Sequence, residues 1–368
     1  MDRVFEPGEI NGMVVENRFV RSATWEGMAA EDGACTPRLT NLMGELAHGG
    51  VGLIISGHAY VSREGQASPW QLGIYSDELV PGLKEMTRTV HEGGGKIIAQ
   101  LAHAGYYARK ALTGTTPLAP SIKGPGRTPR KELSTEDIQH LVQAFADAAR
   151  RAKESGFDGV QIHSAHGYLL SQFLSPMFNK RQDRYGGRIE NRARIHLEIL
   201  RAIREQVGQE YPVLIKMNSQ DFVDGSLTLE DAIHAGMMLE EAGIDAIELS
   251  GGLLTSPPNR GPSRAGIKTE ENEAYFQEGA LAFREKVHVP LILVGGIRSL
   301  EVAERILTQG IADYISMSRP FIREPDLIRR WKAGDRRKAA CLSDNRCFAP
   351  AMAGQGIYCV TERESKTK

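Results

Sequence analysis

The stretch Glu154-Ser155-Gly156-Phe157-Asp158-Gly159-Val160-Gln161-Ile162 carries the pattern that decides the fold. A helix-like segment ends in glycine, and a short aliphatic run follows. The same arrangement recurs at residues 47–55, 241–249 and 308–317. Glycine adopts the left-handed conformation of a helix end at little cost. A continuous aliphatic run suits a strand that is buried on both faces of a parallel sheet, so the repeat predicts alternating helices and parallel strands.

Eight strands are expected once four further runs are added, at residues 19–22, 96–101, 212–218 and 290–294. Capping signals predict helices that begin near Ser134 and Thr228, each followed by acidic residues and an apolar face. No G-x-G-x-x-G sequence follows the first strand, so the dinucleotide fingerprint of an open sheet is missing. The pattern therefore predicts an α/β fold, a single (β/α)8 TIM barrel over residues 1–335, with a short C-terminal extension over 336–368.

The composition is that of a soluble globular protein. The 368 residues include 45 Lys and Arg and 46 Asp and Glu, which gives a net charge of −1. A nearly neutral chain has no general attraction for nucleic acid or for acidic membrane lipids. The first ten residues lack the apolar core of a signal peptide, and no window has the roughly 18 apolar residues of a membrane span. We expect a cytoplasmic protein that acts on a small molecule and binds neither nucleic acid nor membrane.

Polar residues follow the expected strands, at the end where barrel strands converge on one mouth. The ends of the last three strands form one set: Ser250-Gly251-Gly252 after the sixth strand, Gly295-Gly296 after the seventh and Ser318-Arg319 after the eighth. Exposed backbone N–H groups beside a guanidinium predict a phosphate site. The alternative is that these glycines only permit tight turns.

A second set, His163, His166 and Tyr168, follows the fourth strand. Two imidazoles can donate hydrogen bonds to one developing oxyanion, and a nearby phenol can deliver a proton. The alternatives are two structural histidines or a metal pair, with His103 as a third ligand.

Around these residues the chain resembles the old yellow enzyme family of FMN-dependent ene-reductases. The resemblance covers nearly the full length. Its motifs lie at residues 17–24 (NRFVRSAT), 100–105 (QLAHAG), 163–169 (HSAHGYL), 173–176 (FLSP) and 179–192 (NKRQDRYGGRIENR).

The resemblance implies FMN as the cofactor, NADH or NADPH as the electron donor, and a homo-oligomer. It implies that His163 and His166 bind the carbonyl oxygen of the substrate, and that Tyr168 protonates Cα while Cβ receives the flavin hydride. Trp25 would also contact the substrate, at a position where many members of the family have Thr or Cys. The implied cofactor-binding residues are Ser22, Ala23 and Thr24 along one flavin edge, Gly57, Gln100 at the pyrimidine, Lys216 near N1 and O2, and Gly295, Gly296, Ser318 and Arg319 at the phosphate.

The C-terminal extension contains Cys341, Cys347 and Cys359. It resembles the iron–sulfur motif of the 2,4-dienoyl-CoA reductase and trimethylamine dehydrogenase branch, except that Asp344 stands where that motif has a cysteine. Thiolates are the usual cluster ligands, so we expect a degenerate motif with no stable cluster and no metal. The alternative for these cysteines is a set of free thiols in a tail that packs on the barrel.

The leading hypothesis is an NAD(P)H-dependent reductase of an enone, enal, nitroalkene or enoyl thioester. The alternatives are a flavin reductase component fed by a partner electron carrier, a metal-dependent lyase or hydrolase that uses His163, His166 and His103, and a non-catalytic flavin-binding protein.

Overall fold

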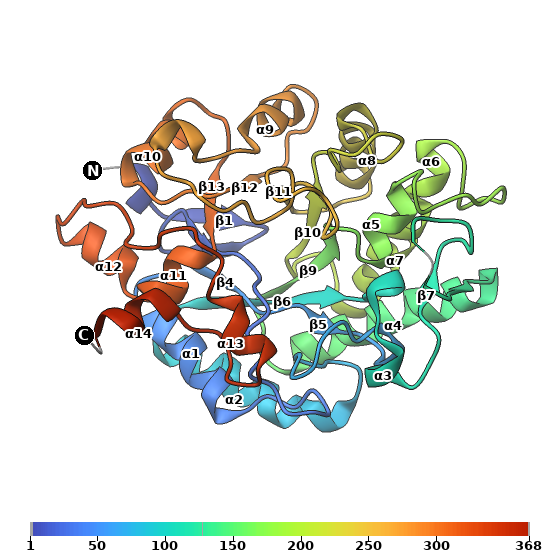
Figure 1. Cartoon of the computed structure of the whole chain (residues 1–368), viewed down its shortest axis with the longest axis horizontal. Coiled ribbons are helices and arrows are strands. Elements are labelled where there is room, and N and C mark those ends of the chain that lie inside the picture. Colours follow the sequence, from blue (N-terminus) through green and yellow to red (C-terminus); the bar gives the residue numbers. More distant parts are fainter. Residues whose placement is uncertain (1–2, 127, 367–368) are drawn as a thin grey trace.

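The computed structural model describes residues 3–126 and 128–366 and contains a closed barrel of eight parallel strands (Figure 1). Each strand pairs with the next in chain order, and β13 pairs with β3 to close the ring. The predicted (β/α)8 TIM barrel is therefore confirmed. In ring order the strands are β3 (Phe19–Arg21), β4 (Leu53–Ile55), β6 (Lys96–Ala102), β9 (Gly159–Ser164), β10 (Val213–Asn218), β11 (Ala246–Ser250), β12 (Leu291–Val294) and β13 (Tyr314–Met317).

Helices surround the barrel and begin where the capping signals predict. Ser134 accepts a hydrogen bond from Asp137 N at 3.0 Å, and Asp137 Oδ2 accepts from Ser134 N at 2.9 Å, which forms a capping box. Gly156 and Gly243 take left-handed φ values of +83° and +89° after their helices, as expected for this residue type. The longer helices are α1 (Pro37–His48), α2 (Val80–Glu92), α4 (Thr135–Glu154), α7 (Arg194–Val207), α8 (Leu229–Glu241), α9 (Gln277–Arg284) and α10 (Leu300–Thr308).

A hairpin of β1 (Gly8–Ile10) and β2 (Met13–Val15) fills the N-terminal end of the barrel. Its buried side chains pack with residues near the starts of the strands, among them Leu53 and Leu214. Any cavity inside the barrel must therefore open at the carboxyl ends of the strands. Shorter elements there and on the rim are β5 (Ala59–Tyr60), β7 (Leu118–Ala119), β8 (Lys131–Glu132), α3 (Lys110–Thr113), α5 (Leu169–Leu174) and α6 (Ile189–Arg192).

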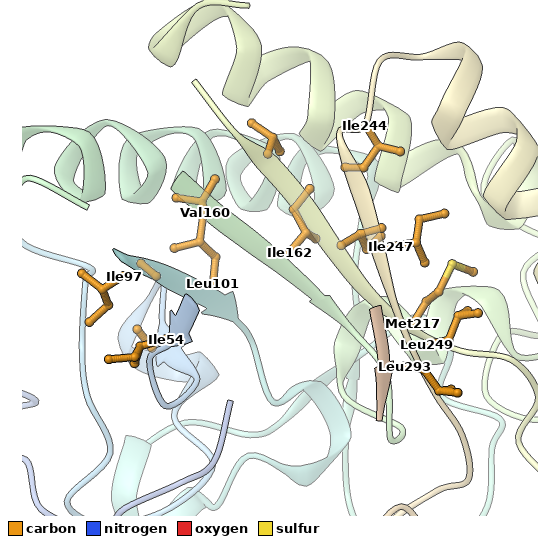
Figure 2. Packing of buried hydrophobic residues seen from close by; sticks show 14 of the residues in the cluster. Ile54, Ile97, Leu101, Val160, Ile162, Met217, Ile244, Ile247, Leu249 and Leu293 are labelled. Carbon is orange, nitrogen blue, oxygen red and sulfur yellow. The ribbon is translucent and has the colours of Figure 1, made fainter. Parts of the chain in front are cut away.

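Side chains along each strand point alternately to the surrounding helices and to the barrel interior, and this separates core residues from site residues. Val160 and Ile162 of β9 belong to the large aliphatic cluster around the barrel (Figure 2). Because successive strand residues point to opposite faces, Gln161 and His163 face the barrel interior.

The C-terminal segment packs back on the barrel (Figure 1). Ile357 N donates to Glu26 O at 2.8 Å, and Asn345 Oδ1 accepts from Arg319 Nη1 at 2.7 Å. It contains α13 (Phe348–Met352) and α14 (Val360–Lys366), which follow α11 (Arg319–Arg323) and α12 (Leu327–Lys332). Over residues 3–126 and 128–366, no helix is both long and apolar enough to cross a membrane.

Candidate active site

A cavity with about 1030 Å³ of empty space opens at the carboxyl ends of the barrel strands. It brings together residues that are far apart in the sequence, because each follows a different strand. The predicted site residues that line it are Ser22, Ala23, Thr24, Trp25, Gln100, His163, His166, Tyr168, Lys216, Gly296, Ser318 and Arg319.

Two predicted cofactor contacts, Gly57 and Gly295, do not line this cavity. The N–H of Gly57 donates to Glu26 Oε1 at 3.1 Å, and a Cβ at this position would lie 2.1 Å from Glu26 Oε2. The carbonyl of Gly295 accepts from Tyr275 N at 3.1 Å. The contact of these two glycines with a cofactor stays a prediction.

Aromatic and imidazole rings gather on one side of the cavity. The His163 ring centroid lies 5.5 Å from that of His166 and 5.0 Å from that of Tyr168. A third histidine, His58, joins them from the end of β4, with its Nε2 3.5 Å from the Tyr168 hydroxyl. His166 Nε2 is 2.8 Å from Ser250 Oγ.

Burial keeps these side chains neutral. It lowers the pKa of His58 to about 4. Burial also lowers the pKa of His163 and His166 well below the usual value, and Lys216 and the neighbouring imidazoles add to the effect. Burial raises the pKa of Tyr168 to about 12, so the phenol keeps its proton at neutral pH. The cluster therefore offers neutral N–H donors and a protonated phenol.

A buried polar network lies beside this cluster in the barrel interior, around Glu248, because Lys216 of the network pairs with His163 across β10 and β9. Its carboxylate accepts from Ser22 Oγ at 2.7 Å, Lys216 Nζ at 3.0 Å, Ser316 Oγ at 2.8 Å and Gln161 Nε2 at 2.9 Å. Burial by itself raises the pKa of Glu248. The Lys216 ammonium and the hydrogen bonds from Ser22, Lys216 and Gln161 outweigh this effect, so the pKa lies below its usual value. The network thus holds an ionised Lys–Glu pair beside the cavity.

The third part of the cavity is cationic. Arg298 and Arg319 are 6% and 7% exposed, and both line it. Arg319 Nη1 donates to Arg264 O at 2.9 Å and to Asn345 Oδ1, whereas Arg298 Nη1 donates to Ile267 O. Within the described part of the chain, no carboxylate lies within 4.0 Å of either guanidinium. Buried charge without a counter-ion calls for an anionic ligand.

The family model for NADH:flavin oxidoreductases and NADH oxidases matches residues 3–338. The chain belongs to this family, that of the old yellow enzymes. Members of this family bind FMN and use NADH or NADPH.

Relatives of this oxidoreductase support the assignment. The chain is 36% identical to an NADH oxidase of Thermoanaerobacter brockii, with 96% of this chain and 57% of that protein aligned. It is 37% identical to an NADPH dehydrogenase of Geobacillus sp., with 88% of this chain and 91% of that protein aligned. The chain thus spans little more than half the length of the first relative.

Solved structures of the family have the same fold. A 2-naphthoyl-CoA reductase complexed with 2-naphthoyl-CoA superimposes with a TM-score of 0.90 at 28% identity, over 97% of this chain and 56% of that one. A morphinone reductase bound to tetrahydroNAD superimposes with a TM-score of 0.76 at 28% identity, over 90% of this chain and 91% of that one.

The residues of this flavin oxidoreductase fit FMN at both ends. Arg298 and Arg319 supply uncompensated positive charge for a phosphate. Lys216 and Gln100 supply a donor and an amide for the polar edge of the pyrimidine. The cavity between them is lined by Ala23, Val294 and Met317, among others, which suits a flat apolar ring.

Among the residues of this site that had no role in the sequence prediction are His58, Gln161, Glu248 and Arg298. Gln161 and Glu248 do carry a sequence signal, because each is polar within an aliphatic run that is otherwise buried. Arg298 follows the glycine pair by two residues, which is the only sequence hint of its role.

The metal hypothesis finds no support in the site. His103 is buried, contacts Gly105 N through Nδ1 at 3.0 Å and does not line the cavity. In residues 3–126 and 128–366, no three His, Cys, Asp or Glu side chains are grouped to hold a metal.

In the C-terminal cysteine motif, Asp344 accepts a hydrogen bond from Thr361 Oγ1 at 2.7 Å. Burial raises the pKa of Cys347 to about 12 and also raises the pKa of Cys341.

Proposed function

We propose that this chain reduces an activated C=C bond, in an enone, enal, nitroalkene or enoyl thioester, with electrons from NADH or NADPH. The observation that carries the proposal is the placement of His163, His166 and Tyr168 on one wall of a cavity that also fits FMN. Arg298, Arg319, Lys216 and Gln100 would hold FMN, which would supply the hydride carrier between the nicotinamide and the β carbon of the substrate.

The imidazoles polarise the substrate carbonyl. We assign the His166 proton to Nδ1, with Nε2 accepting from Ser250 Oγ at 2.8 Å, because this tautomer leaves an N–H for the substrate. His163 Nδ1 is sealed without a partner. We assign the His163 proton to Nε2, because Nδ1 is sealed from any ligand. Each ring thus offers one N–H to the carbonyl oxygen. Charge moves onto this oxygen as the β carbon accepts hydride, and removing one such donor typically costs about 10²–10³ in rate.

Tyr168 supplies the proton to the α carbon. Its hydroxyl lies 3.5 Å from Nε2 of His58, a ring that burial keeps neutral. This contact orients the phenol without removing its proton. The phenol therefore stays a donor across the neutral pH range.

The experiment is an anaerobic comparison of the two half-reactions on the purified holoenzyme. The bound flavin is first bleached with NADH or NADPH and then mixed with a panel of enones, nitroalkenes and enoyl-CoA thioesters. Reappearance of the oxidised spectrum with one equivalent of saturated product supports the proposal. A protein that is bleached normally but is reoxidised by no member of the panel contradicts it.

A further inference from the structure

The Glu248 network is a series of linked hydrogen bonds. The Glu248 carboxylate at one end determines which group donates and which accepts in each of them. Glu248 and Gln161 are both 0% exposed and do not line the cavity, whereas Gln100, Lys216 and Ser22 do. The strand register pairs Lys216 with Glu248, and Gln100 with Gln161. Two polar residues below the cavity thus each support a polar residue that faces it.

An ionised carboxylate only accepts hydrogen bonds. Gln161 must therefore turn its NH2 group to Glu248, which it reaches at 2.9 Å. The Gln161 carbonyl oxygen is left to accept from Gln100 Nε2 at 2.7 Å. Gln100 consequently has its own carbonyl oxygen free, because no hydrogen bond within the described residues uses it. The carboxylate thereby decides that Gln100 offers an acceptor to the cavity.

The same carboxylate sets the roles of Ser22 and Lys216. Ser22 gives its one hydroxyl proton to Glu248 and accepts from Lys216 Nζ at 2.7 Å. Lys216 uses two of its three N–H groups on Ser22 and Glu248, which leaves one for the cavity. The wall thus presents one charged donor and one amide acceptor, which complements the N3–H donor and the O2 and N1 acceptors of a flavin pyrimidine.

We propose that Glu248 is a positioning residue, which fixes through Gln161 the amide atom that Gln100 presents to the flavin and offsets part of the Lys216 charge there. The inference rests on the proposed function in that FMN is the occupant. An amide at position 248 can face its oxygen to the Lys216, Ser22 and Ser316 donors and its NH2 to Gln161. That arrangement reverses the direction of the hydrogen bonds from residue 248 through Gln161 to Gln100. Gln100 then points its NH2 group at the N3–H of the flavin ring.

The test uses two flavins and two variants. Apoprotein is titrated with FMN and with 3-methyl-FMN, which lacks the N3–H donor, and the midpoint potential of each holoprotein is measured. The parent is expected to prefer FMN by about five- to hundredfold, the value of one buried hydrogen bond. In Glu248→Gln the ratio of the affinities for FMN and 3-methyl-FMN falls toward one. The potential also moves to a more positive value, because Lys216 loses its counter-charge beside a ring that gains negative charge on reduction.

Gln161→Leu separates the two effects. It removes the hydrogen bonds that connect Glu248 to Gln100 but keeps the Glu248–Lys216 pair. The affinity ratio of FMN to 3-methyl-FMN should therefore fall, while the flavin midpoint potential stays near that of the parent. Gln143→Leu is the matched control, because Gln143 is an exposed residue of α4 whose side chain bonds Asp147. If Glu248→Gln does not fold, Glu248→Asp, which keeps the charge, should keep the parent potential, and Gln161→Leu still tests the amide chain.

Two outcomes overturn the inference and leave the proposed function intact. One is an unchanged preference for FMN over 3-methyl-FMN in Gln161→Leu. The other is a potential in Glu248→Gln that is equal to or more negative than that of the parent. A parent apoprotein that binds no FMN would instead contradict the proposed function.

Discussion

Replacing Arg319 by methionine should weaken the binding of FMN but not that of riboflavin. Arg319 lies at the end of β13, is 7% exposed and has no carboxylate within 4.0 Å among the residues that the structure describes. Its Nη1 is held by Arg264 O at 2.9 Å and by Asn345 Oδ1 at 2.7 Å. The side chain is therefore pre-organised and its charge is uncompensated until an anion binds.

The magnitude follows from one charge-assisted hydrogen-bonding group. Such a group contributes about 1.5–3 kcal/mol, which corresponds to a loss of about 10- to 150-fold in FMN affinity. Riboflavin has no phosphate, so its affinity should change by less than about threefold. Arg298 supports the same phosphate and limits the loss.

The assay is quenching of flavin fluorescence during titration of apoprotein. Arg188→Met is the matched control, because the Arg188 side chain is 86% exposed on the surface. Equal losses for FMN and riboflavin in Arg319→Met would refute the reasoning, since they would show that the substitution damages the ring site or the fold rather than a phosphate contact.

Further outcomes follow from the same geometry. Tyr168→Phe should slow substrate reduction by about 10²–10⁴ while flavin reduction by NADH or NADPH stays near normal; equal losses in stopped-flow traces of both half-reactions would exclude the phenol as proton donor. His196, which bonds Ser164 at 2.8 Å, has a pKa lowered by burial to about 4. The unfolded chain therefore binds more protons between about pH 6.5 and 4, so stability is lost as pH falls through this window. Tm should fall as the pH is lowered through this window, and it should fall less steeply in His196→Gln; parallel plots of Tm against pH for the two proteins would contradict this. Gly57→Ala should cost about 1–3 kcal/mol in urea unfolding, because its Cβ would lie 2.1 Å from Glu26 Oε2; an unchanged midpoint would show that Glu26 moves away freely.

Much of the fold follows from local pattern. The runs at 159–162 and 246–249 are confirmed as β9 and β11, and the capping signal at Ser134 begins α4 as predicted. These features depend on neighbours in the chain, such as a hydroxyl that caps an N–H group two or three residues ahead. The motif residues His163, His166 and Tyr168 were also predictable, because strand ends in a barrel share one mouth.

The oligomeric state and the cellular location stay predictions, as do the cofactor contacts of Gly57 and Gly295. Trp25 lines the cavity, and its contact with a substrate stays a prediction.

The amino-acid sequence by itself determined the number and order of strands, the family and the residues at the strand ends, since all of these are properties of short segments. Only the tertiary structure decided how Gln161 and Glu248 act, and which arginines lack a counter-charge. The register across β6, β9, β10 and β11 places Gln100, Gln161, Lys216 and Glu248 within hydrogen-bonding distance of one another or of a shared neighbour. Hydrogen-bond direction and charge balance depend on such distances between remote residues, and these exist only once the barrel is closed.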